Sequence, residues 1–388
     1  MTVPINPLLS AVSPPPIPEV HGWLEGREFP SSLQLIDVAQ AVPSGVPPMA
    51  EHLNRVLANR DVWRYTAIEG LAELREALAA DISATYSAPV GPEHVLVTAG
   101  CNQAFCLATL AVAQSGDEIV LPVPYYFNHQ MWLDMMGVRG VHLPFRPEAD
   151  GVPSVAQAAE RITPRTRAIV LVTPNNPTGA LYPPEVLRGF FELAKDKRIA
   201  LILDETYRDF LPAAGPPHDL FGDSEWGETL VHLYSFSKAF SITGHRVGAI
   251  AASASFLAQV GKAMDCVAIC APRLGQEAAL FGLRELGPWR AQNAEAMRGR
   301  LAAFRTSMEV VPQFQVVSAG AYFAYVRHPF RGVPATEVAR RLATEQNLLC
   351  LPGSMFGPAQ DEYLRFAFAN IDEKVMPQLV NRLFELAS

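Results

Sequence analysis

The chain has 388 residues, of which 49% are hydrophobic and 18% are charged, and its formal net charge is −8. This length and composition are ordinary for a globular protein of about two domains of roughly 150 residues each. The acidic balance, without any basic run, argues against nucleic acid and anionic membranes as partners.

The five cysteines form an odd set without paired CxxC spacing, so the sequence predicts neither a disulfide framework nor a metal site. The start of the chain has no basic segment followed by an apolar one, and no run approaches the roughly 18 apolar residues of a membrane span. We therefore expect a soluble, cytoplasmic protein that binds no metal.

The first 22 residues contain six prolines, at positions 4, 7, 14, 15, 16 and 18. Because proline blocks the interior of a helix, we expect an extended arm, without a helix, that lies across a partner subunit. After the arm we expect a short strand over 33–38 and a helix that begins near Pro48. A turn closed by Gly70 and a second helix over 71–86 follow.

From residue 95 onward short apolar strands alternate with helices, which is the pattern of a parallel sheet covered on both faces. The expected strands are 94–98, 117–122, 167–172, 199–204, 230–235 and 247–251. From about residue 290 long helices mix with strands, which predicts a smaller α+β domain. We therefore predict an α/β fold with a mostly parallel sheet. The predicted division is an arm with part of the small domain (1–48), a large domain (49–285) and a C-terminal small domain (286–388).

The strand expected at 230–235 leads into Ser235-Phe236-Ser237-Lys238, and Arg246 follows shortly after. Burial lowers the pKa of a lysine, and the neutral amine that results attacks carbonyl groups. Ser235, Ser237 and Arg246 suit a phosphate. These residues indicate a lysine that holds pyridoxal phosphate covalently, with the phosphate on the serines and the arginine. The alternative is ordinary turn chemistry after a strand.

Ligands of open α/β sheets bind beyond the carboxyl ends of the strands, so the residues after each strand are candidates for a site. Gly100, Cys101 and Asn102 lead into a helix whose free N–H groups suit a phosphate. Tyr126 lies in an aromatic group that suits the face of a flat ring. On these residues alone, a small-residue loop and ordinary core aromatics are open alternatives.

Asp204 directly continues five apolar residues, and a buried carboxylate there demands a cation or several donors. A pyridinium nitrogen would supply the cation. Tyr207 follows three residues later, and Asn176 lies after the neighbouring strand, so both suit the ring oxygen of the same ligand. The alternative for Asp204 is a helix N-cap satisfied by backbone donors.

The motifs TPNNPTG, DETY, SFSK and GHRVG together resemble those of the class I/II aminotransferases, pyridoxal-phosphate enzymes that include aspartate, aromatic, methionine and kynurenine aminotransferases. The resemblance covers the chain from about residue 33 to the end. It implies the fold of the pyridoxal-phosphate transferases and pyridoxal 5'-phosphate as cofactor. It also implies that Lys238 forms the Schiff base, that Asp204 pairs with the pyridinium nitrogen, and that Asn176 and Tyr207 bond the ring hydroxyl.

Further roles come only through this resemblance. Ser235, Arg246 and the backbone of Gly100, Cys101 and Asn102 are expected to hold the phosphate. Tyr126 is expected to stack on the face of the ring, and His129 to support Asp204 from behind. Tyr65 corresponds to a tyrosine that reaches the phosphate from the neighbouring subunit, which implies a homodimer with shared sites.

The substrate site is also assigned by resemblance. Arg365, in YLRFAFA, corresponds to the arginine that binds the substrate's α-carboxylate, and Asn176 is a second expected substrate contact. The loop PGSMFGP at 352–358 matches the family as well. The chain departs from the pattern at Ala41, where glycine is usual, and we expect its methyl group to narrow the site. It also departs at Cys101, which replaces a smaller or hydroxyl residue.

We therefore predict a pyridoxal-phosphate-dependent aminotransferase that moves the amino group of an L-amino acid to a 2-oxo acid by a ping-pong mechanism. The alternatives on the same scaffold are a C–S β-lyase, a cyclopropane-forming elimination and an amino-acid oxidase. A non-catalytic sensor domain of a regulator would need a DNA-binding segment, yet residues 1–32 contain only Arg27 as a basic residue. The sequence leaves the side chain of the amino donor open.

Overall fold

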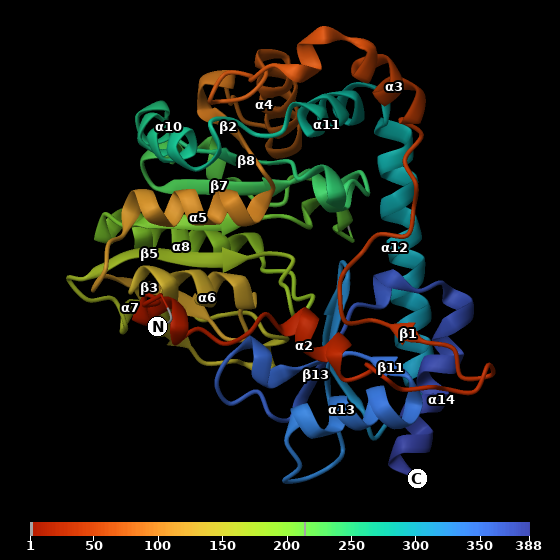
Figure 1. The fold of residues 1–388 in the computed structure, drawn as a ribbon. Coiled ribbons are helices and arrows are strands. Elements are labelled where there is room, and N and C mark those ends of the chain that lie inside the picture. Colours follow the sequence, from red (N-terminus) through yellow and green to blue (C-terminus); the bar gives the residue numbers. More distant parts are fainter. Residues whose placement is uncertain (1–2, 213–214) are drawn as a thin grey trace.

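The computed structural model describes residues 3–212 and 215–388, and its largest element is a seven-stranded sheet (Figure 1). Its strands are β2 (Val95–Thr98), β3 (Glu118–Pro122), β4 (Arg139–Leu143), β5 (Thr166–Val172), β6 (Ala200–Asp204), β7 (Leu230–Ser235) and β8 (Gly248–Ala251). They lie in the order β2-β8-β7-β6-β5-β3-β4. Neighbours from β7 to β4 are parallel, and β8 is antiparallel to both β2 and β7. The predicted, mostly parallel sheet is confirmed; β4 was not predicted.

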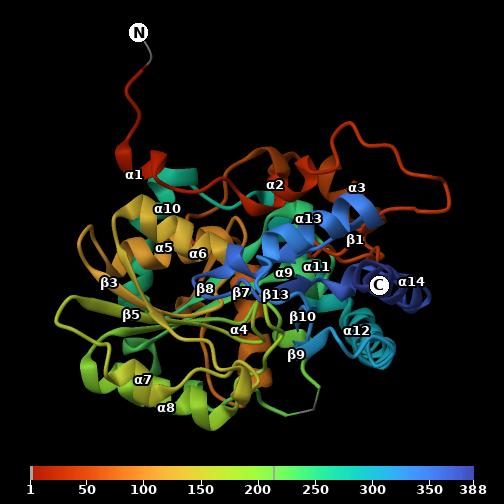
Figure 2. The ribbon, with the colours of Figure 1, turned by 90° about the horizontal axis from the view of Figure 1, so that it is seen from below.

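Helices cover both faces of this sheet, as the sequence predicted. Figure 2 shows α5 (Cys101–Val112) and α6 (Phe127–Met136) on one side, and α7 (Val155–Ala159) and α8 (Pro184–Lys197) on the other. The remaining helices of this part are α3 (Ala50–Ala58), α4 (Ala72–Tyr86), α9 (Phe236–Ala239), α10 (Ala254–Ala268) and α11 (Arg273–Glu285). Both α4 and α10 contact β2, and α9 is a single turn directly after β7.

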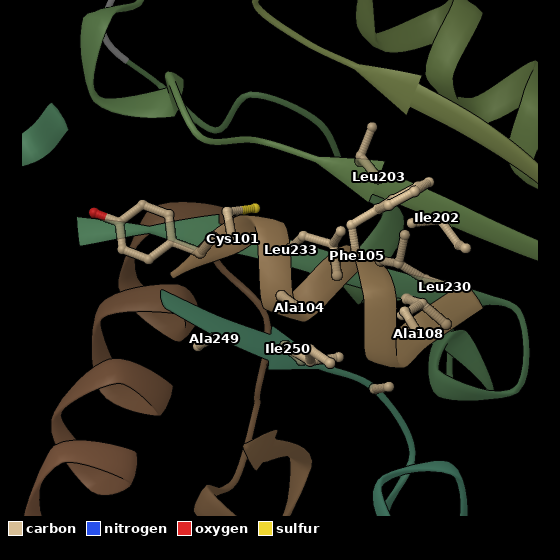
Figure 3. Packing of buried hydrophobic residues seen from close by; sticks show 14 of the residues in the cluster. Cys101, Ala104, Phe105, Ala108, Ile202, Leu203, Leu230, Leu233, Ala249 and Ile250 are labelled. Atoms are coloured by element: carbon tan, nitrogen blue, oxygen red, sulfur yellow. The ribbon is translucent and has the colours of Figure 1, made fainter. Parts of the chain in front are cut away.

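The packing of α5 places its N-terminus at the carboxyl edge of the sheet. Figure 3 shows Phe105 and two alanines of α5 against apolar side chains of β6, β7 and β8. Phe105, Leu203 and Leu233 are almost completely buried there. Because α5 follows β2 after only two residues, its first N–H groups lie at the edge where β2, β6 and β7 end.

A second hydrophobic core surrounds an antiparallel sheet in the later part of the chain. The strands are β9 (Gln315–Gly320), β10 (Phe323–Arg327), β12 (Leu351–Pro352) and β13 (Tyr363–Phe366), and the helices are α12 (Gly287–Met308), α13 (Ala335–Gln346) and α14 (Met376–Ala387). The short β1 (Ile36–Asp37) pairs in parallel with β11 (Leu348–Leu349), so the N-terminal segment joins this core. The predicted smaller α+β unit is therefore present, and its boundaries at 48 and 285 stay predictions.

The prediction that the N-terminal arm contains no helix is wrong. Residues Pro7–Ser10 form α1 and Pro16–Gly22 form α2. Both helices begin at a proline, which the first helical turn tolerates because an N–H there has no intrahelical partner. Val20 of α2 is fully buried among Ala39, Phe127 and Leu349 of the same chain. This part of the arm therefore packs on its own chain, and the expected contact of the arm with a partner subunit stays a prediction.

No helix within residues 3–212 and 215–388 combines the length and the apolar character that crossing a membrane requires.

A buried ion network connects α4 to α12. Asp81 of α4 pairs with Arg208, and its Oδ1 lies 2.7 Å from Nη1 of Arg290 in α12. Arg290 also pairs with Asp209, whose Oδ2 accepts a hydrogen bond from the Tyr234 hydroxyl at 2.9 Å. Burial acts to raise the pKa of Asp81, but the two arginines outweigh it and the pKa is lowered. Asp81 therefore stays ionised, and together with Asp209 it balances the charges of Arg208 and Arg290.

We predict that Asp81→Asn lowers the free energy of unfolding by about 3 kcal/mol, because it leaves the buried guanidinium of Arg208 without its carboxylate. The matched control is Glu51→Gln, which removes an exposed pair with Arg55 in α3 and should cost under about 0.5 kcal/mol. Urea unfolding followed by tryptophan fluorescence measures both. Equal losses in the two variants would show that the network contributes no more than a surface pair.

Candidate active site

A cavity of about 540 Å³ lies at the carboxyl ends of β5, β6 and β7, where the sequence predicted a site. Most of the predicted residues line it: Ala41, Cys101, Asn102, Tyr126, Asn176, Asp204, Tyr207, Ser235, Ser237, Lys238, Arg246 and Arg365. These side chains come from both hydrophobic cores and from the segment between β1 and α3. The fold therefore brings together residues that lie more than 300 positions apart in the sequence.

Lys238 lies in α9, one turn after β7, and its Nζ donates a hydrogen bond to the backbone oxygen of Ala41. Burial, and to a lesser extent the positive charges of Arg365 and Arg246, lower the pKa of Lys238 to about 7. Its only hydrogen bond among the described residues is to a neutral carbonyl, which does not restore the pKa. About half of the Lys238 side chains are therefore uncharged near pH 7, and the uncharged amine is the form that nucleophilic attack requires.

Asp204 ends β6 and is buried. Its Oδ1 accepts hydrogen bonds from the backbone N–H of Thr206 at 2.9 Å and from the Thr206 hydroxyl at 2.7 Å. Asp204 is not the N-cap of a helix, since the next helical turn begins at Arg208, but this oxygen caps the turn that follows β6. Burial raises the pKa of Asp204, and the Thr206 contacts lower it only in part. A cation at the cavity face would favour its ionised form.

His129 lies behind Asp204 and outside the cavity wall. Its Nε2 is 3.7 Å from Asp204 Oδ2, and its ring stacks on Phe105 with centroids 3.8 Å apart. Burial lowers the pKa of His129 to about 3, so the imidazole is neutral. Among the described residues its Nδ1 has no hydrogen-bond partner. A neutral histidine in this position lies against the carboxylate of Asp204 without compensating its negative charge.

One end of the cavity forms a cradle for an anion. Gly100 has φ +87°, and a Cβ placed there would lie 2.2 Å from Nη2 of Arg246, so only glycine allows the guanidinium to approach. Arg246 is oriented by a 2.8 Å hydrogen bond from Nη1 to the backbone oxygen of Thr243. The N-terminus of α5 begins beside it at Cys101. The arrangement suits a phosphate, because a guanidinium and free helical N–H groups converge there.

Arg365 forms the opposite end of the cavity. It lies in β13 and is buried, and all its hydrogen-bond partners among the described residues are neutral: Nη1 donates to Asn176 Oδ1 at 3.2 Å and Nη2 to the backbone oxygen of Ala39. Its Nε has no partner there. Burial lowers the pKa of Arg365 to about 10. A buried guanidinium whose partners are all neutral suits a carboxylate ligand.

Tyr126 and Tyr207 lie between these two ends. Burial raises the pKa of Tyr126 to about 12, and its hydroxyl accepts a hydrogen bond from Asn128 Nδ2 at 3.0 Å. Burial likewise raises the pKa of Tyr207 well above its ordinary value. Both phenols are therefore protonated and can donate hydrogen bonds at neutral pH.

Tyr65 does not reach the cavity of its own chain. Its side chain is 74% exposed, next to the exposed Trp63. Gly100 is not among the residues that line the cavity, although it lies against the guanidinium of Arg246, which does line it. The predicted contact of Tyr65 with the phosphate of a neighbouring subunit therefore stays a prediction.

Several cavity residues had no predicted role: Pro15, Ile17, Gln40, Val42, Phe127, Asn128, Val172, Thr206, Thr243 and Gly244. Thr206 had a local signal, since a threonine two residues after an aspartate is typical of a side-chain-capped turn. Pro15 and Ile17 had none, because the arm reaches the cavity only through tertiary packing.

A sequence model of the family described as aminotransferase class I and II matches residues 29–383. The chain belongs to this family. The aromatic aminotransferase ISS1 of Arabidopsis thaliana is 28% identical over 360 residues, which cover 90% of this chain and 88% of that protein. The aspartate aminotransferase of Sulfolobus acidocaldarius is 26% identical over 329 residues, with 83% and 82% covered. A solved structure, aspartate aminotransferase from Thermus thermophilus with maleate, has a TM-score of 0.90 at 26% identity and covers 99% of this chain and 100% of that one.

We predict that Lys238 of this aminotransferase-family chain titrates near pH 7 in the protein without cofactor, because it is buried beside two arginines. Amine labelling across a pH series, read by peptide mass spectrometry, should show its reactivity rising around pH 7. Lys195 is the control, since its hydrogen bond to Asp223 raises its pKa and delays its reaction to alkaline pH. If Lys238 becomes reactive only together with Lys195, the predicted pKa is wrong.

Proposed function

We propose that the cavity binds pyridoxal 5'-phosphate and that the protein transfers the amino group of an L-amino acid to a 2-oxo acid by a ping-pong mechanism. One observation carries the proposal: a buried lysine with a lowered pKa shares a cavity with an anion cradle and an unpaired buried arginine. Family membership supports the same reaction, since the matched relatives named above are aminotransferases.

The residues present fit the cofactor at each of its functional groups. The phosphate would be held by Arg246, Ser235, Ser237 and the backbone at the start of α5. Asp204 would meet the ring nitrogen. Tyr207 and Asn176 would bond the ring oxygen, and Tyr126 would cover the ring face. The Lys238 amine, which lines the same cavity, would hold the cofactor through its aldehyde carbon. Among the described residues, Nε of Arg365 in the cavity wall has no hydrogen-bond partner, which supports an arrangement built around a ligand.

Pyridoxal phosphate, when bound, supplies a carbonyl that amines condense with and a ring that accepts electrons from the substrate's α-carbon. The chain's own residues do the remaining work. Arg365 binds the α-carboxylate through its planar fork and orients the α-carbon. The neutral form of Lys238 accepts the proton of the substrate's α-carbon at Nζ and then returns it to a carbon of the cofactor. Asp204, ionised beside a cation, holds the ring nitrogen in its protonated state.

The alternative reactions on the same scaffold are not favoured, because the similar proteins named above are all aminotransferases. Elimination at a carbon–sulfur bond would release ammonia without an amino acceptor. Amino-acid oxidation would consume oxygen. Transamination alone requires a 2-oxo acid in equal amount, so product analysis separates the three.

We expect purified protein to bind pyridoxal phosphate at Lys238 and to produce one new amino acid for each 2-oxo acid consumed. Borohydride reduction and peptide mapping should locate the cofactor on Lys238. Lys238→Ala should lower turnover by at least about 10²-fold, the usual contribution of a positioned proton-transfer group. Lys262→Ala, which removes an exposed lysine of α10, is the control and should keep full activity. Ammonia release or oxygen uptake without a 2-oxo acid would overturn the proposal.

We also propose a cytoplasmic homodimer in which Tyr65 reaches the phosphate of the partner's cofactor. The five cysteines are all free, which supports a reducing compartment. Large apolar side chains near Tyr65 in sequence support an interface, since Trp63 is 79% exposed and Leu57 is 44% exposed. The domain division at about residues 48 and 285 is likewise a proposal, supported by the two hydrophobic cores.

Subunit mixing tests the shared site. Lys238→Ala and Tyr65→Ala chains should each have low activity, and exchange between them should restore activity, because one site of each mixed dimer regains both residues. The control mixes Lys238→Ala with Arg246→Ala. Those residues line the same cavity of one chain, so no intact site can form and no activity should return. A fully active monomer, or no recovery after verified exchange, would show that Tyr65 acts elsewhere.

A further inference from the structure

A fully buried glutamine of α11 fixes the turn that leads into α4. Gln276 lies in the first turn of α11, and its side chain has no exposed surface. Its Oε1 accepts a hydrogen bond from the backbone N–H of Leu71 at 2.7 Å. Its Nε2 donates to the Thr66 hydroxyl at 3.1 Å and to the backbone oxygen of Ala271 at 2.9 Å. One side chain therefore holds both ends of the segment between Thr66 and Leu71.

The same turn is also fixed on the large sheet. The backbone N–H of Val97 in β2 donates to the backbone oxygen of Glu69 at 2.9 Å. Gly70 has φ +102°, and a Cβ placed there would lie 2.9 Å from Oε1 of Gln276 and closer still to the Val97 side chain. Only glycine therefore lets the turn approach both β2 and α11. Tyr65 directly precedes this turn and is 74% exposed, so a fixed piece of backbone presents an exposed tyrosine.

The first turn of α11 also lies against the anion cradle of its own chain. Gly275 packs so closely on the backbone oxygen of His245 that a Cβ would have no room. His245 directly precedes Arg246, whose guanidinium forms the cradle. Two neighbouring residues, Gly275 and Gln276, thus contact the chain's own cradle and the turn that presents Tyr65. In a two-fold symmetric dimer the same helix would set both partners of each phosphate contact.

We propose that Gln276 is a positioning residue, which holds Tyr65 where its hydroxyl reaches the phosphate in the partner's cavity. The inference rests on the proposed cofactor and on the proposed homodimer with a shared site. A hydroxyl bonds an oxygen only within a narrow range of distances and angles. A turn that had to be ordered when the ligand binds would weaken binding by the free energy of that ordering. Because Gln276 orders the turn during folding, binding does not bear this cost.

The first experiment measures the binding of pyridoxamine 5'-phosphate by calorimetry, because this probe has no aldehyde to bond with Lys238. Tyr65→Ala should raise its dissociation constant at least about tenfold, since a hydrogen bond to a charged group is lost. Gln276→Leu should raise it at least about threefold, and no more than Tyr65→Ala does. The double variant should bind no more weakly than Tyr65→Ala, because both changes remove one interaction. Pyridoxamine, which lacks the phosphate, should bind all these proteins equally.

Variants of Thr66 test the same contact without changing a fully buried residue. Thr66→Val removes only the hydroxyl that Gln276 binds, and it should raise the dissociation constant of pyridoxamine 5'-phosphate about twofold. Thr66→Ser keeps the hydroxyl and should restore the value of the unchanged protein. The matched control is Ser83→Ala in α4, which removes a hydroxyl that accepts a 2.9 Å hydrogen bond from the Val90 N–H and should leave binding unchanged.

Subunit mixing separates a role in the partner's cavity from damage to the variant's own chain. Gln276→Leu mixed with Lys238→Ala should recover activity, because one site of each mixed dimer has an intact Lys238 and a correctly held Tyr65. Arg246→Ala mixed with Lys238→Ala is the control and should recover none, since both residues line the cavity of their own chain. A Gln276 variant that damaged its own cavity would behave like the control.

The outcomes separate this inference from the proposals on which it rests. If Tyr65→Ala binds pyridoxamine 5'-phosphate as tightly as the unchanged protein, the shared site is wrong and this inference fails with it, while the aminotransferase reaction stands on its own tests. If Tyr65→Ala weakens binding but Gln276→Leu and Thr66→Val do not, only the role of Gln276 is overturned. Further weakening in the double variant, weaker binding of pyridoxamine, or no recovery on mixing would show that Gln276 acts on its own chain alone.

Discussion

The positive charge around the cavity is the constraint on which the rest of the site depends. Lys238, Arg246 and Arg365 line one space, and Asp204 is the single carboxylate among the described side chains there. Like charges raise one another's free energy most where water is excluded. Burial, together with the two arginines, lowers the pKa of Lys238 as a result. The proposed phosphate and carboxylate ligands each bring a negative charge to one arginine, and both charges favour a protonated Lys238, so its proton affinity depends on what is bound.

The two residues at the end of β6, Asp204 and Glu205, have different surroundings. Asp204 lines the cavity, whereas the next residue, Glu205, is buried with His218 and His232, whose Nε2 atoms lie 3.1 and 3.0 Å from its Oε2. Burial acts to raise the pKa of Glu205, but the two histidines outweigh it and the carboxylate stays ionised. Arg208 then joins the network that ties α4 to α12. The backbone that orients Asp204 is therefore stabilised by the charged contacts of Glu205 and Arg208, which lie outside the cavity lining.

Sequence predicted the positions that follow directly from strand order. Lys238, Asp204 and Asn176 each come after a strand of the sheet, and parallel strands place their carboxyl ends at one edge, so local patterns were enough to gather them. Ile17 could not be found this way, since the arm reaches the cavity only by packing on another core. The sequence does not predict the helices of the arm, because six prolines in 22 residues favour an extended chain, although a proline at the first helical position is compatible with a helix.

Arg365 links the two hydrophobic cores at the point where substrate would bind. It extends from β13 in the second core and donates to Asn176, which follows β5 of the first. The rings of Phe323 and Phe356 lie 4.8 and 5.2 Å from its guanidinium carbon, so little water screens its charge. A carboxylate bound at this position, as proposed for the substrate, would be held by a residue of one core that is oriented by the other. On that proposal the affinity for substrate would depend on how the two cores sit together, and a substitution that shifts one against the other would change substrate binding before it changed the chemistry at Lys238.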